Sequence, residues 1–334
     1  MKKRKIITIS IITILTLLIG GLTIFFVLTG KDNKNSPTQE EKKESTSTPL
    51  LYEVTKENSD TKIYLFGSIH VANDKAYPLP NKILEAYKTS DFIAVEFDMI
   101  EFSTDFSAQT EAAQKFLCPD GKKLKDVMYE DSYNLLINYL KENNQYNSLY
   151  EYYRPVMFYS IIQNIMVEKT KLDSNKGIDM YFLKQAKKDK KEILEIESAQ
   201  YQYDLLSSFP DKLFDLLIKY SIKNEEQMIK DTKDLYDAWL TGNKEKIIES
   251  STDGNEEDFE EGFEEYDDDL EIIIADYSER LITKRNIEML EKVKQYFKEE
   301  KNVFVVVGAA HIVGDGALVE LLTSNDYNVT QINY

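Results

Sequence analysis

The sequence predicts an α/β fold, with a mixed, largely parallel central sheet flanked by helices, a mostly helical middle region and one N-terminal transmembrane helix. Short β-branched and apolar runs, typical of buried strands, occur near both ends of the region from Leu51 to Tyr334. Between them, at about 124–242, apolar residues recur at helical spacing. Residues 6–29 are uncharged and long enough to cross a membrane. These features favour one α/β domain behind a membrane anchor.

The N-terminal part of the domain has the order strand, helix, strand. We expect a short strand at 52–54 and a buried strand at 62–66 that ends at Gly67, because these runs are β-branched and aromatic. The segment NKILEAYKTS, residues 81–90, has the apolar spacing of a helix, and FIAVEF, residues 92–97, is a second buried strand. A strand, a helix and a strand in succession form a βαβ unit, which predicts a parallel pair.

The rest of the domain is predicted as helices interrupted by one strand. Helical spacing covers 133–140, 156–168, 177–188, 211–220 and 225–240. The alternating run EILEIE at 192–197 follows a helix and predicts a third strand of the sheet. After a long helix at about 277–298, we expect a buried strand at 303–307, a helix at 317–322 and a last strand at 329–332.

Composition excludes several classes of function. The net charge of −18 and the pI near 4.7 argue against nucleic acid or anionic lipid headgroups as partners of the main body, since phosphate binding needs clustered Lys and Arg. Cys118 is the sole cysteine, which excludes an internal disulfide, cysteine-based zinc sites and CxxC redox chemistry.

The N-terminus predicts a single-pass anchor in the cell membrane. MKKRK supplies four basic residues before the apolar stretch, which places the N-terminus in the cytoplasm and the main domain outside. A cleaved signal peptide is the alternative, but the apolar stretch is longer than the usual h-region and no convincing A-x-A site follows. We therefore expect an anchor at 1–30, a flexible stalk at 31–50 and the folded domain at 51–334.

An acidic segment is the least regular part of the domain. Residues 253–271 contain twelve acidic residues in nineteen and no basic residue. A site for calcium or for a cationic peptide is one interpretation, but the ligand spacing of an EF-hand loop is absent. We expect an acidic loop at about 251–271, exposed to solvent.

Both histidines of the chain occupy the same local setting. His70 in YLFGSIHVA and His311 in VFVVVGAAHIVG each end a Gly-x-x-His that follows an apolar run. With 12 glycines in 334 residues, chance would place glycine three residues before both histidines about once in a thousand cases. Glycine lets the chain leave the strand with unusual backbone angles and lets a ligand approach. A structural role for one histidine is the ordinary alternative.

Two carboxylates follow other predicted strands. Glu96 ends FIAVE, with Asp98 two residues later, and Glu197 ends EILEIE. Ligands of α/β proteins bind outside the carboxyl ends of the strands, so these side chains can share a crevice with the histidines. Two histidines with one or two glutamates predict a site for Zn, Mn, Fe or Co that activates water and polarises a carbonyl. Taken alone, Glu96 and Glu197 would be interpreted as ordinary strand-end carboxylates.

Several blocks of the sequence resemble the TraB/PrgY/GumN family, which includes the Tiki metalloproteases. GSIH and GAAH resemble its paired Gly-x-x-His motifs, and FIAVEFD its strand with a glutamate, here Glu96. Residues 177–210 resemble the central block of the family, and Gly177, Asp179, Glu197 and Gln202 occupy its motif positions. RNIEML matches an Arg-Asn motif at Arg285 and Asn286. Ser68 stands where threonine is common, and Asp326 replaces a usual glycine.

The resemblance implies a metal-dependent hydrolase with a divalent metal, Mn, Co or Zn, held by His70, His311 and Glu96. In Tiki-like members the reaction is peptide hydrolysis, so we expect a membrane-anchored peptidase that acts through metal-activated water, with Glu96 or Glu197 as ligand or general base. Arg285 is expected to hold a substrate carboxylate or an oxyanion, or else to form a salt bridge with Glu96 or Glu197.

Two other functions remain open at this point. The first is a non-catalytic protein that binds and sequesters a peptide signal, as proposed for pheromone-shutdown members of the family. The second is a dinucleotide enzyme, but the glycines at 308, 314 and 316 do not fit G-x-G-x-x-G. The sequence gives neither the substrate nor the oligomeric state.

Overall fold

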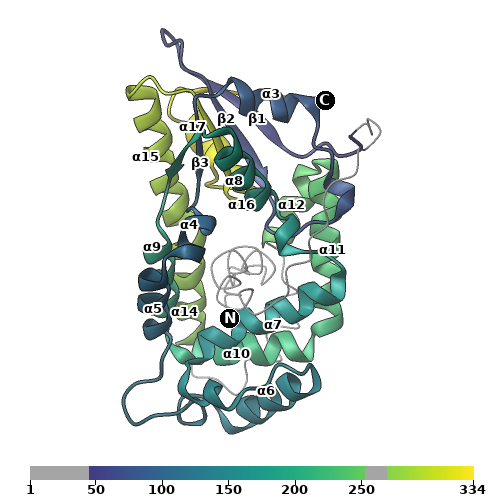
Figure 1. Cartoon of the computed structure of the whole chain (residues 1–334), viewed down its shortest axis with the longest axis vertical. Helices are drawn as coiled ribbons and strands as arrows, with labels where there is room; N and C mark the ends of the chain where they lie inside the picture. Colours follow the sequence, from purple (N-terminus) through teal and green to yellow (C-terminus); the bar gives the residue numbers. More distant parts are fainter. Residues whose placement is uncertain (1–44, 253–268) are drawn as a thin grey trace, which may run out of the picture.

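A computed structural model describes residues 45–252 and 269–334, in which a six-stranded sheet occupies one end of the molecule (Figure 1). The strand order is β4-β3-β5-β2-β1-β6. The strands are β1 (Leu51–Thr55), β2 (Ile63–Ser68), β3 (Phe92–Val95), β4 (Glu192–Glu195), β5 (Val303–Gly308) and β6 (Asn328–Gln331). Three pairings are parallel, β2 with β5, β5 with β3 and β3 with β4, whereas β1 pairs antiparallel with β2 and β6. The predicted α/β fold with a mixed, mostly parallel sheet is confirmed.

One detail of the predicted βαβ unit differs in the structure. β2 and β3 run parallel, but β5 lies between them and pairs with both. The order of elements in the sequence predicts that β2 and β3 are parallel. It cannot show that β5, about 200 residues later in the chain, lies between them. The insertion matters for the site, because it brings the end of β5 beside the ends of β2 and β3.

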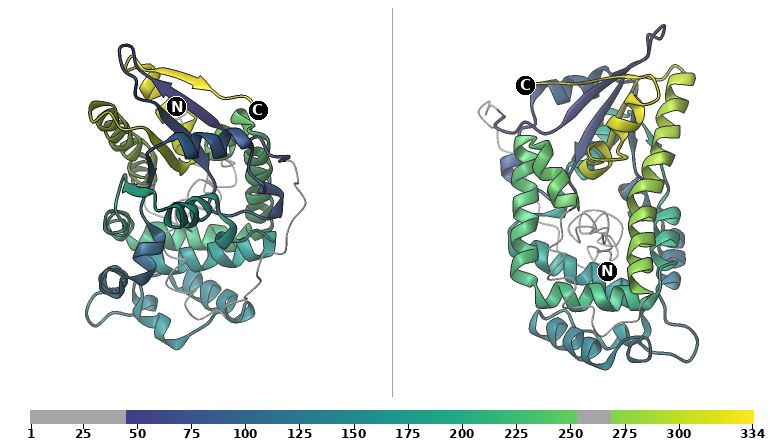
Figure 2. Two further views of the ribbon diagram at one scale, coloured as in Figure 1. Left: turned by 45° about the horizontal axis from the view of Figure 1, so that its top comes forward. Right: turned by 180° about the vertical axis from the view of Figure 1, so that it is seen from behind.

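Helices cover both faces of the sheet. α3 (Asn81–Thr89) and α8 (Ile178–Asp189) lie on one face, and α15 (Lys284–Lys298), α16 (Ala309–Ile312) and α17 (Leu318–Thr323) lie on the other (Figures 1 and 2). The change of face follows from topology. The connections from β2 to β3 and from β3 to β4 run toward one edge of the sheet, whereas the connection from β4 to β5 runs back toward the other edge. Because crossovers between parallel strands are right-handed, reversing the direction places the connecting helix on the opposite face.

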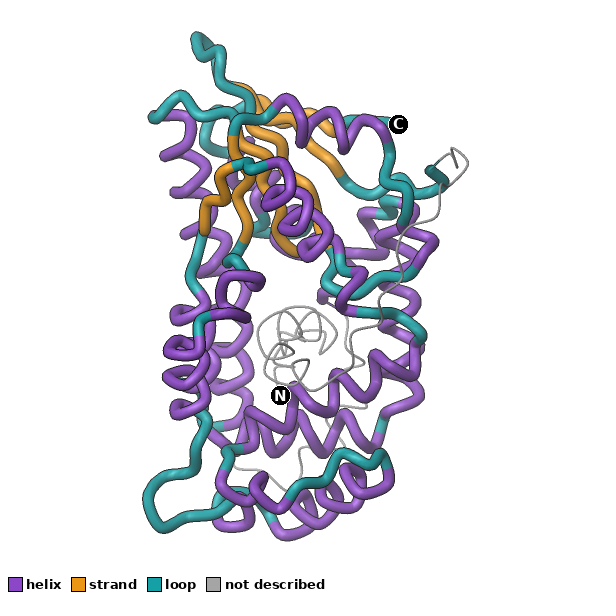
Figure 3. The backbone as a smooth tube through the Cα atoms, viewed as in Figure 1, coloured by secondary structure: helices purple, strands orange, loops and turns teal. Residues whose placement is uncertain are grey.

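The helical middle region extends away from the sheet and closes the far end of the molecule (Figure 3). Its helices are α4 (Met99–Thr104), α5 (Phe106–Lys115), α6 (Glu130–Glu142), α7 (Pro155–Thr170), α9 (Ala199–Ser207), α10 (Asp211–Lys223), α11 (Glu225–Thr241) and α12 (Lys244–Thr252). Short 3-10 turns occur at Asp74–Ala76, Leu124–Asp126, Ser148–Tyr152 and Ser174–Lys176. All five helices expected between about 124 and 242 are present, as α6, α7, α10 and α11 here and α8 on the sheet, whereas the shorter α4, α5, α9 and α12 were not anticipated.

Local sequence explains where the longest of these helices begin and end. Pro155 occupies the first turn of α7, where its missing N–H costs no hydrogen bond. α11 ends at Gly242, whose φ of 60° is left-handed and suits glycine. A Cβ on Gly242 would also lie only 2.2 Å from the carbonyl oxygen of Thr48. The absence of a side chain at Gly242 therefore lets the start of the domain pack closely against this helix end.

The long helix expected at 277–298 is interrupted. α14 (Leu270–Ser278) passes into a π-helical turn at Glu279–Thr283, which continues as α15. A π turn inserts extra backbone into one helical turn and is frequent at functional sites. Here it directly precedes Arg285, one of the predicted site residues.

Aromatic side chains join the sheet to α3 and α8. Phe66 of β2 and Phe304 of β5 stack with centroids 5.8 Å apart, and Phe182 of α8 lies 4.9 Å from Phe304. Tyr87 of α3 contacts both Phe182 and Phe304, and Trp239 of α11 donates from Nε1 to the carbonyl of Gly67 at 2.8 Å. This buried cluster fixes the strand ends that carry the site.

The predicted anchor at 1–30 lies outside the described residues, as do most of the stalk and of the acidic segment. Among the helices that are described, none has the length and hydropathy of a membrane span. At the edge of the described region, Ser47 and Leu50 are buried, and the backbone N–H of Thr48 donates to Leu240 at 2.7 Å. Contacts with the domain therefore begin a few residues before position 51.

Candidate active site

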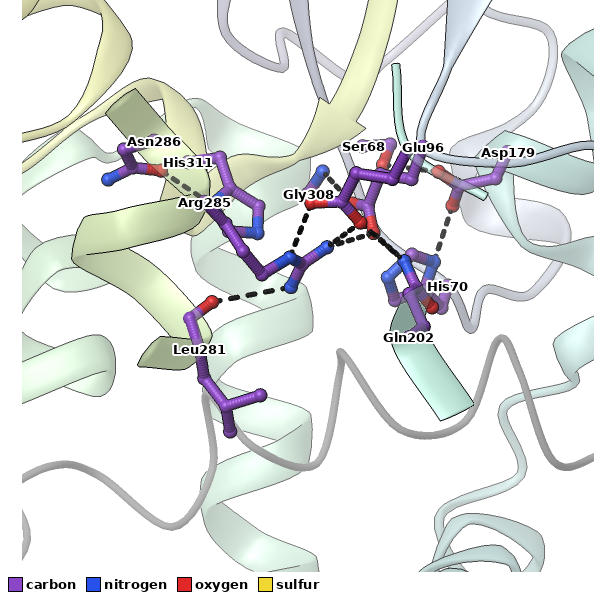
Figure 4. Close-up of polar contacts among 11 residues, drawn as sticks. Ser68, His70, Glu96, Asp179, Gln202, Leu281, Arg285, Asn286, Gly308 and His311 are labelled. Atoms are coloured by element: carbon purple, nitrogen blue, oxygen red, sulfur yellow. Dashed lines mark hydrogen bonds and ion pairs between the residues drawn. The ribbon is translucent and has the colours of Figure 1, made fainter. Parts of the chain in front are cut away.

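The predicted site residues meet at the carboxyl edge of the parallel strands. Ser68 of β2 is in register with Gly308 of β5, and Val95 of β3 with Val306, so the chain segments that follow these strands lie together. His70 follows β2, Glu96 follows β3, and His311 lies in α16 directly after β5. In Figure 4 the carboxylate of Glu96 lies between the two histidines. The sheet thus gathers residues that are far apart in the sequence.

His70 is oriented by an acidic partner from α8. Its Nδ1 lies 2.8 Å from Oδ2 of Asp179, and Oδ1 of Asp179 accepts from the Ser68 hydroxyl at 2.7 Å. A carboxylate is an acceptor, so Nδ1 of the ring carries the proton and Nε2 of the neutral ring presents a lone pair. Asp179 therefore fixes both the ring orientation and the tautomer of His70.

His311 has an equivalent partner from α15. Its Nδ1 lies 2.6 Å from Oδ1 of Asn286, and Nδ2 of Asn286 donates to the carbonyl of Gly316 at 2.9 Å. Because the Asn286 amide uses its nitrogen as a donor to Gly316, its oxygen is the acceptor for His311 Nδ1–H. His311 therefore also presents a lone pair at Nε2.

Both of these Nε2 atoms are buried and have no hydrogen-bond partner among the described residues. His311 is fully buried and His70 is 8% exposed. Burying an unpaired acceptor is unfavourable, and metal-binding histidines commonly give their other N–H to a carboxylate or a carbonyl. The two orphaned nitrogens, each with an oriented ring, fit a divalent metal of the Mn, Co or Zn type.

Glu96 is held by three donors from three other elements. Its Oε1 accepts from the Gly308 N–H at 3.1 Å, and its Oε2 accepts from Arg285 Nη2 at 2.8 Å and from Gln202 Nε2 at 3.2 Å. Oε1 thus accepts one hydrogen bond and Oε2 accepts two. A carboxylate oxygen has two lone pairs, so Oε1 retains capacity for a further ligand or proton.

Arg285 forms the salt bridges that the sequence left as an alternative. Its Nε donates to Glu197 Oε1 at 2.6 Å and its Nη2 to Glu197 Oε2 at 2.9 Å, in addition to the bond with Glu96. Nη1 donates to the carbonyl of Leu281 in the π turn at 3.3 Å. Gln202 Nε2 also reaches Glu197 Oε2, at 2.9 Å. Glu197 is therefore fully engaged with Arg285 and Gln202.

The pKa values of four buried site residues, Glu96, His311, His70 and Arg285, are strongly shifted. Burial raises the pKa of Glu96, but Arg285 and then the two histidines outweigh it and lower that pKa to about 2. Burial and then Arg285 lower the pKa of His311 to about 3. Burial also lowers the pKa of His70, but Asp179 outweighs it and raises the pKa to about 9, so a metal ion at Nε2 would displace a proton from that nitrogen. Glu197 and Glu96 raise the pKa of Arg285 against the effect of burial.

The balance of charge in the cluster favours a cation. Three buried carboxylates, on Glu96, Glu197 and Asp179, face the guanidinium of Arg285 and the protonated ring of His70, so one negative charge is uncompensated. Uncompensated buried charge is costly. Even so, over residues 45–252 and 269–334 no three His, Cys, Asp or Glu side chains form a group that could hold a metal ion as they are placed. The assignment of His70, His311 and Glu96 as ligands stays a prediction.

Glycine serves the two Gly-x-x-His segments differently from our expectation. Gly308 has a φ of −50°, and Gly67 is absent from the described residues with positive φ, so neither needs glycine for its backbone angles. A Cβ on Gly67 would lie 3.2 Å from Cα of Ala309, whereas one on Gly308 would lie 3.7 Å from Glu96 Oε1 and from His311 Cδ2. Gly67 permits close packing of the two segments, and Gly308 leaves space beside the site.

A small cavity adjoins this cluster. It is lined by His70, Val95, Glu96, Phe97, Met99, Asp179 and Gln202. Asp98 is not among these residues. Its Oδ1 caps α4 by accepting from Ile100 N and Glu101 N, and its Oδ2 pairs with Lys187 at 2.6 Å. Asp98 therefore has a structural role, and Glu96 is the carboxylate of this segment that belongs to the site.

Comparison with known proteins identifies the family. The profile of the TraB/PrgY/gumN family matches residues 50–331. The chain belongs to the TraB/PrgY/gumN family. The match spans the sheet, the helical middle region and every residue of the candidate site, which places all of them within one family domain.

The curated relatives of this TraB/PrgY/gumN chain are distant. Metalloprotease TIKI1 of Xenopus tropicalis is 22% identical over 323 residues, covering 86% of this chain and 62% of TIKI1. Metalloprotease TIKI1 of Homo sapiens is 24% identical, covering 81% of this chain and 60% of its own length. Uncharacterized protein YbaP of Escherichia coli K12 is 28% identical over 154 residues, 46% of this chain and 55% of YbaP. No solved structure matches.

The chain thus spans between 55% and 62% of the length of these relatives. The sequence patterns of this family member pointed to His70, His311, Glu96, Glu197 and Arg285. They assigned no role to the residues that orient them, which are Ser68, Asp179, Gln202 and Asn286. Only the resemblance to family motifs marked these positions, because a polar residue on a helix does not reveal its partner on another element.

Proposed function

We propose that this protein is a membrane-anchored, outward-facing, metal-dependent hydrolase that cleaves peptides. The observation that carries the proposal is the pair of histidines whose Nδ1 atoms are held by Asp179 and Asn286 and whose Nε2 atoms are buried without a partner among the described residues. Membership of a family related to TIKI metalloproteases supports the choice of peptides as substrate.

Three residues would hold the metal in this proposal. His70 and His311 would bind through Nε2, and Glu96 through its carboxylate. A divalent ion of the Mn, Co or Zn type, when bound at such ligands, lowers the pKa of water and polarises a carbonyl. Asp179 and Asn286 would keep the two rings in the tautomer that binds, which is the usual role of such partners.

The remaining site residues would handle the proton and the developing negative charge. Oε1 of Glu96 accepts one hydrogen bond, so its remaining lone pair would serve either as a metal ligand or as the base that takes a proton from the attacking water. Arg285, fixed in place by Glu197, would stabilise the oxyanion of the tetrahedral intermediate, because a preorganised guanidinium needs no reorientation during the reaction. Glu197 would act on catalysis through Arg285.

Metal analysis gives a test that does not depend on activity. The purified full-length chain in detergent, loaded with Mn²⁺ or Co²⁺ and desalted, should retain metal by mass spectrometry, and His70→Ala and His311→Ala should retain far less. Ser132→Ala is a matched control, because Ser132 is also buried without a partner in the described structure but belongs to α6. Equal metal content in all four proteins would overturn the metal assignment.

Peptide turnover separates the hydrolase from the rival function, which is sequestration of a peptide signal. The same proteins would be incubated with a tryptic digest of casein, and the products identified by mass. New fragments that depend on metal and on both histidines support hydrolysis. Stoichiometric retention of peptides without fragments favours the sequestering protein instead.

Placement outside the cell rests on the N-terminal sequence, where four basic residues precede an uncharged stretch. A protease added to intact cells should degrade the domain, and should spare it when the basic residues are moved to the other side of the stretch. Protection of the unaltered protein in intact cells would contradict the proposed orientation.

A further inference from the structure

A second group of buried polar atoms has no partner within the described residues. Six of the nine such atoms belong to α7, α10 and α14: Tyr159 Oη, Ser160 Oγ, both amide atoms of Gln163, Ser221 Oγ and Tyr277 Oη. Two of the other three are the histidine Nε2 atoms of the candidate site. Buried polar groups in native proteins are almost always paired, so both groups of atoms require partners, such as water, a metal ion or a substrate, that the described residues do not supply.

Three members of this group are connected by packing. Tyr159 and Gln163 are one turn apart on α7 and so share a helix face. The ring of Phe214 on α10 lies 6.0 Å from Tyr159 and 6.1 Å from Tyr277. Burial, and then the neighbouring Tyr159, raise the pKa of the Tyr277 hydroxyl. Both tyrosines are therefore neutral donors at physiological pH.

The same helix that carries Tyr277 also carries the guanidinium of the candidate site. Tyr277, Leu281 and Arg285 occupy successive turns through the π segment, and Arg285 donates to the carbonyl of Leu281. Eight residues of helix correspond to about 12 Å. An extended peptide covers that distance in about three to four residues.

We propose that Gln163 and Tyr277, with Tyr159, form a subsite that binds the main chain of an extended peptide about three to four residues from the bond held at His70, His311 and Glu96. A glutamine side chain offers one carbonyl acceptor and one amide donor, the complement of the N–H and C=O of a peptide unit. Gln163 has both atoms buried and unpaired. The tyrosine hydroxyls add donors for peptide carbonyls.

This inference rests on the proposed function for its substrate class and adds where the substrate is recognised. Recognition of the main chain is independent of side chains, so the substrates would be extended peptides of varied sequence and sufficient length. Peptides of three residues would be too short to occupy the subsite and the candidate active site together.

Conservative variants separate a binding role from a structural one. Gln163→Leu and Tyr277→Phe remove polar atoms that have no partner in the described structure, so the melting temperature should stay the same or rise. Tyr87→Phe is the matched control. The hydroxyl of Tyr87 donates to Asp189 at 3.1 Å, so its removal should lower the melting temperature and leave peptide binding unchanged.

Binding is measured on the full-length chain in detergent and EDTA, by fluorescence anisotropy with fluorescein-labelled pools of random octapeptides and random tripeptides. Tyr277→Phe should weaken octapeptide binding by about three- to tenfold, as expected for one lost hydrogen bond, and Gln163→Leu, which removes a donor and an acceptor, by at least as much. Both variants should leave tripeptide binding unchanged. Octapeptide affinity equal to that of the unaltered chain, or an absence of octapeptide binding by the unaltered chain, would overturn the subsite.

The outcome is distinguishable from that of the hydrolase proposal. Length-dependent binding that Gln163→Leu weakens, without cleavage of any peptide in Mn²⁺ or Co²⁺, would leave the subsite in place and remove the hydrolase. Cleavage with unchanged octapeptide binding in both variants would do the reverse.

Discussion

The Nδ1 atom of His311 lies 2.6 Å from the amide oxygen of Asn286, and the amide nitrogen of Asn286 is bonded to the carbonyl of Gly316. One side chain thereby fixes the histidine ring and the loop that follows it. Asp179 does the same for His70 while it also accepts from Ser68. The two histidines therefore owe their orientation to helices α15 and α8, which lie on opposite faces of the sheet.

Removal of the amide of Asn286 should weaken metal binding. Asn286→Ala leaves Nδ1 of the buried His311 without an acceptor, so the ring loses its fixed tautomer. We expect the affinity for Mn²⁺ or Co²⁺ to fall by about 10- to 100-fold, the usual effect of losing such a partner. Competition with a fluorescent chelator measures it. Asn286→Asp keeps an acceptor and is the control; similar affinities for the alanine variant and the original protein would contradict the role of Asn286.

Asp179 and Ser68 should differ in importance. Asp179→Ala removes the acceptor of His70 directly, so metal affinity should again fall by about 10- to 100-fold. Ser68→Ala removes a hydroxyl that contacts Asp179 only, and its effect should be clearly smaller. The same chelator competition compares them. A larger loss in the serine variant would show that the chain of contacts from Ser68 through Asp179 to His70 is misassigned.

Loss of the guanidinium should destabilise the fold. Arg285→Met leaves Glu96 and Glu197 buried without their cation, and breaking a buried ion pair in this way costs about 3–5 kcal/mol. Urea unfolding of the metal-free protein should show that decrease in the free energy of unfolding. Adding Glu197→Gln to Arg285→Met should recover part of it, because one buried charge is removed. If the double variant is less stable than the single variant, the electrostatic explanation fails.

The two motif glycines should respond differently to alanine. Gly67→Ala places a Cβ 3.2 Å from Cα of Ala309, a backbone atom that cannot move easily, so we expect a loss of about 1–3 kcal/mol in unfolding free energy. Gly308→Ala meets only ordinary contacts at 3.7 Å, so its stability should change little. Thermal or urea unfolding of the two variants measures these changes in stability. Equal destabilisation by both substitutions would be inconsistent with the packing described.

Strands and their chemistry could be predicted because apolar runs and the residues after them are local signals. His70, Glu96 and His311 each follow such a run, and parallel strands end at one edge, so their position at a common edge followed from the fold class, whereas their proximity depended on the strand order. The neighbours of each strand could not be predicted in the same way. β5 entered between β2 and β3 because pairing is a long-range choice that local periodicity does not encode.

The side-chain partners of the site residues also could not be predicted from the sequence. Arg285 was expected to bind substrate or to form a salt bridge with Glu96 or Glu197, and the structure shows bonds to both. The contacts of Asn286 with His311 and of Asp179 with His70 connect helices to strand ends across 25 and 109 residues, respectively. Such contacts depend on how helices pack, and the residue types alone do not specify it.

The position of β5 has a consequence for how the protein is made. Residues 303–308 form the strand that joins β2 to β3, and His311 follows it directly. While the chain is being synthesised, everything up to residue 302 can emerge with two halves of a sheet and a single histidine. The two histidines of the candidate site therefore come together only after residues 303–311 have left the ribosome, so a chain shortened before them carries no assembled site.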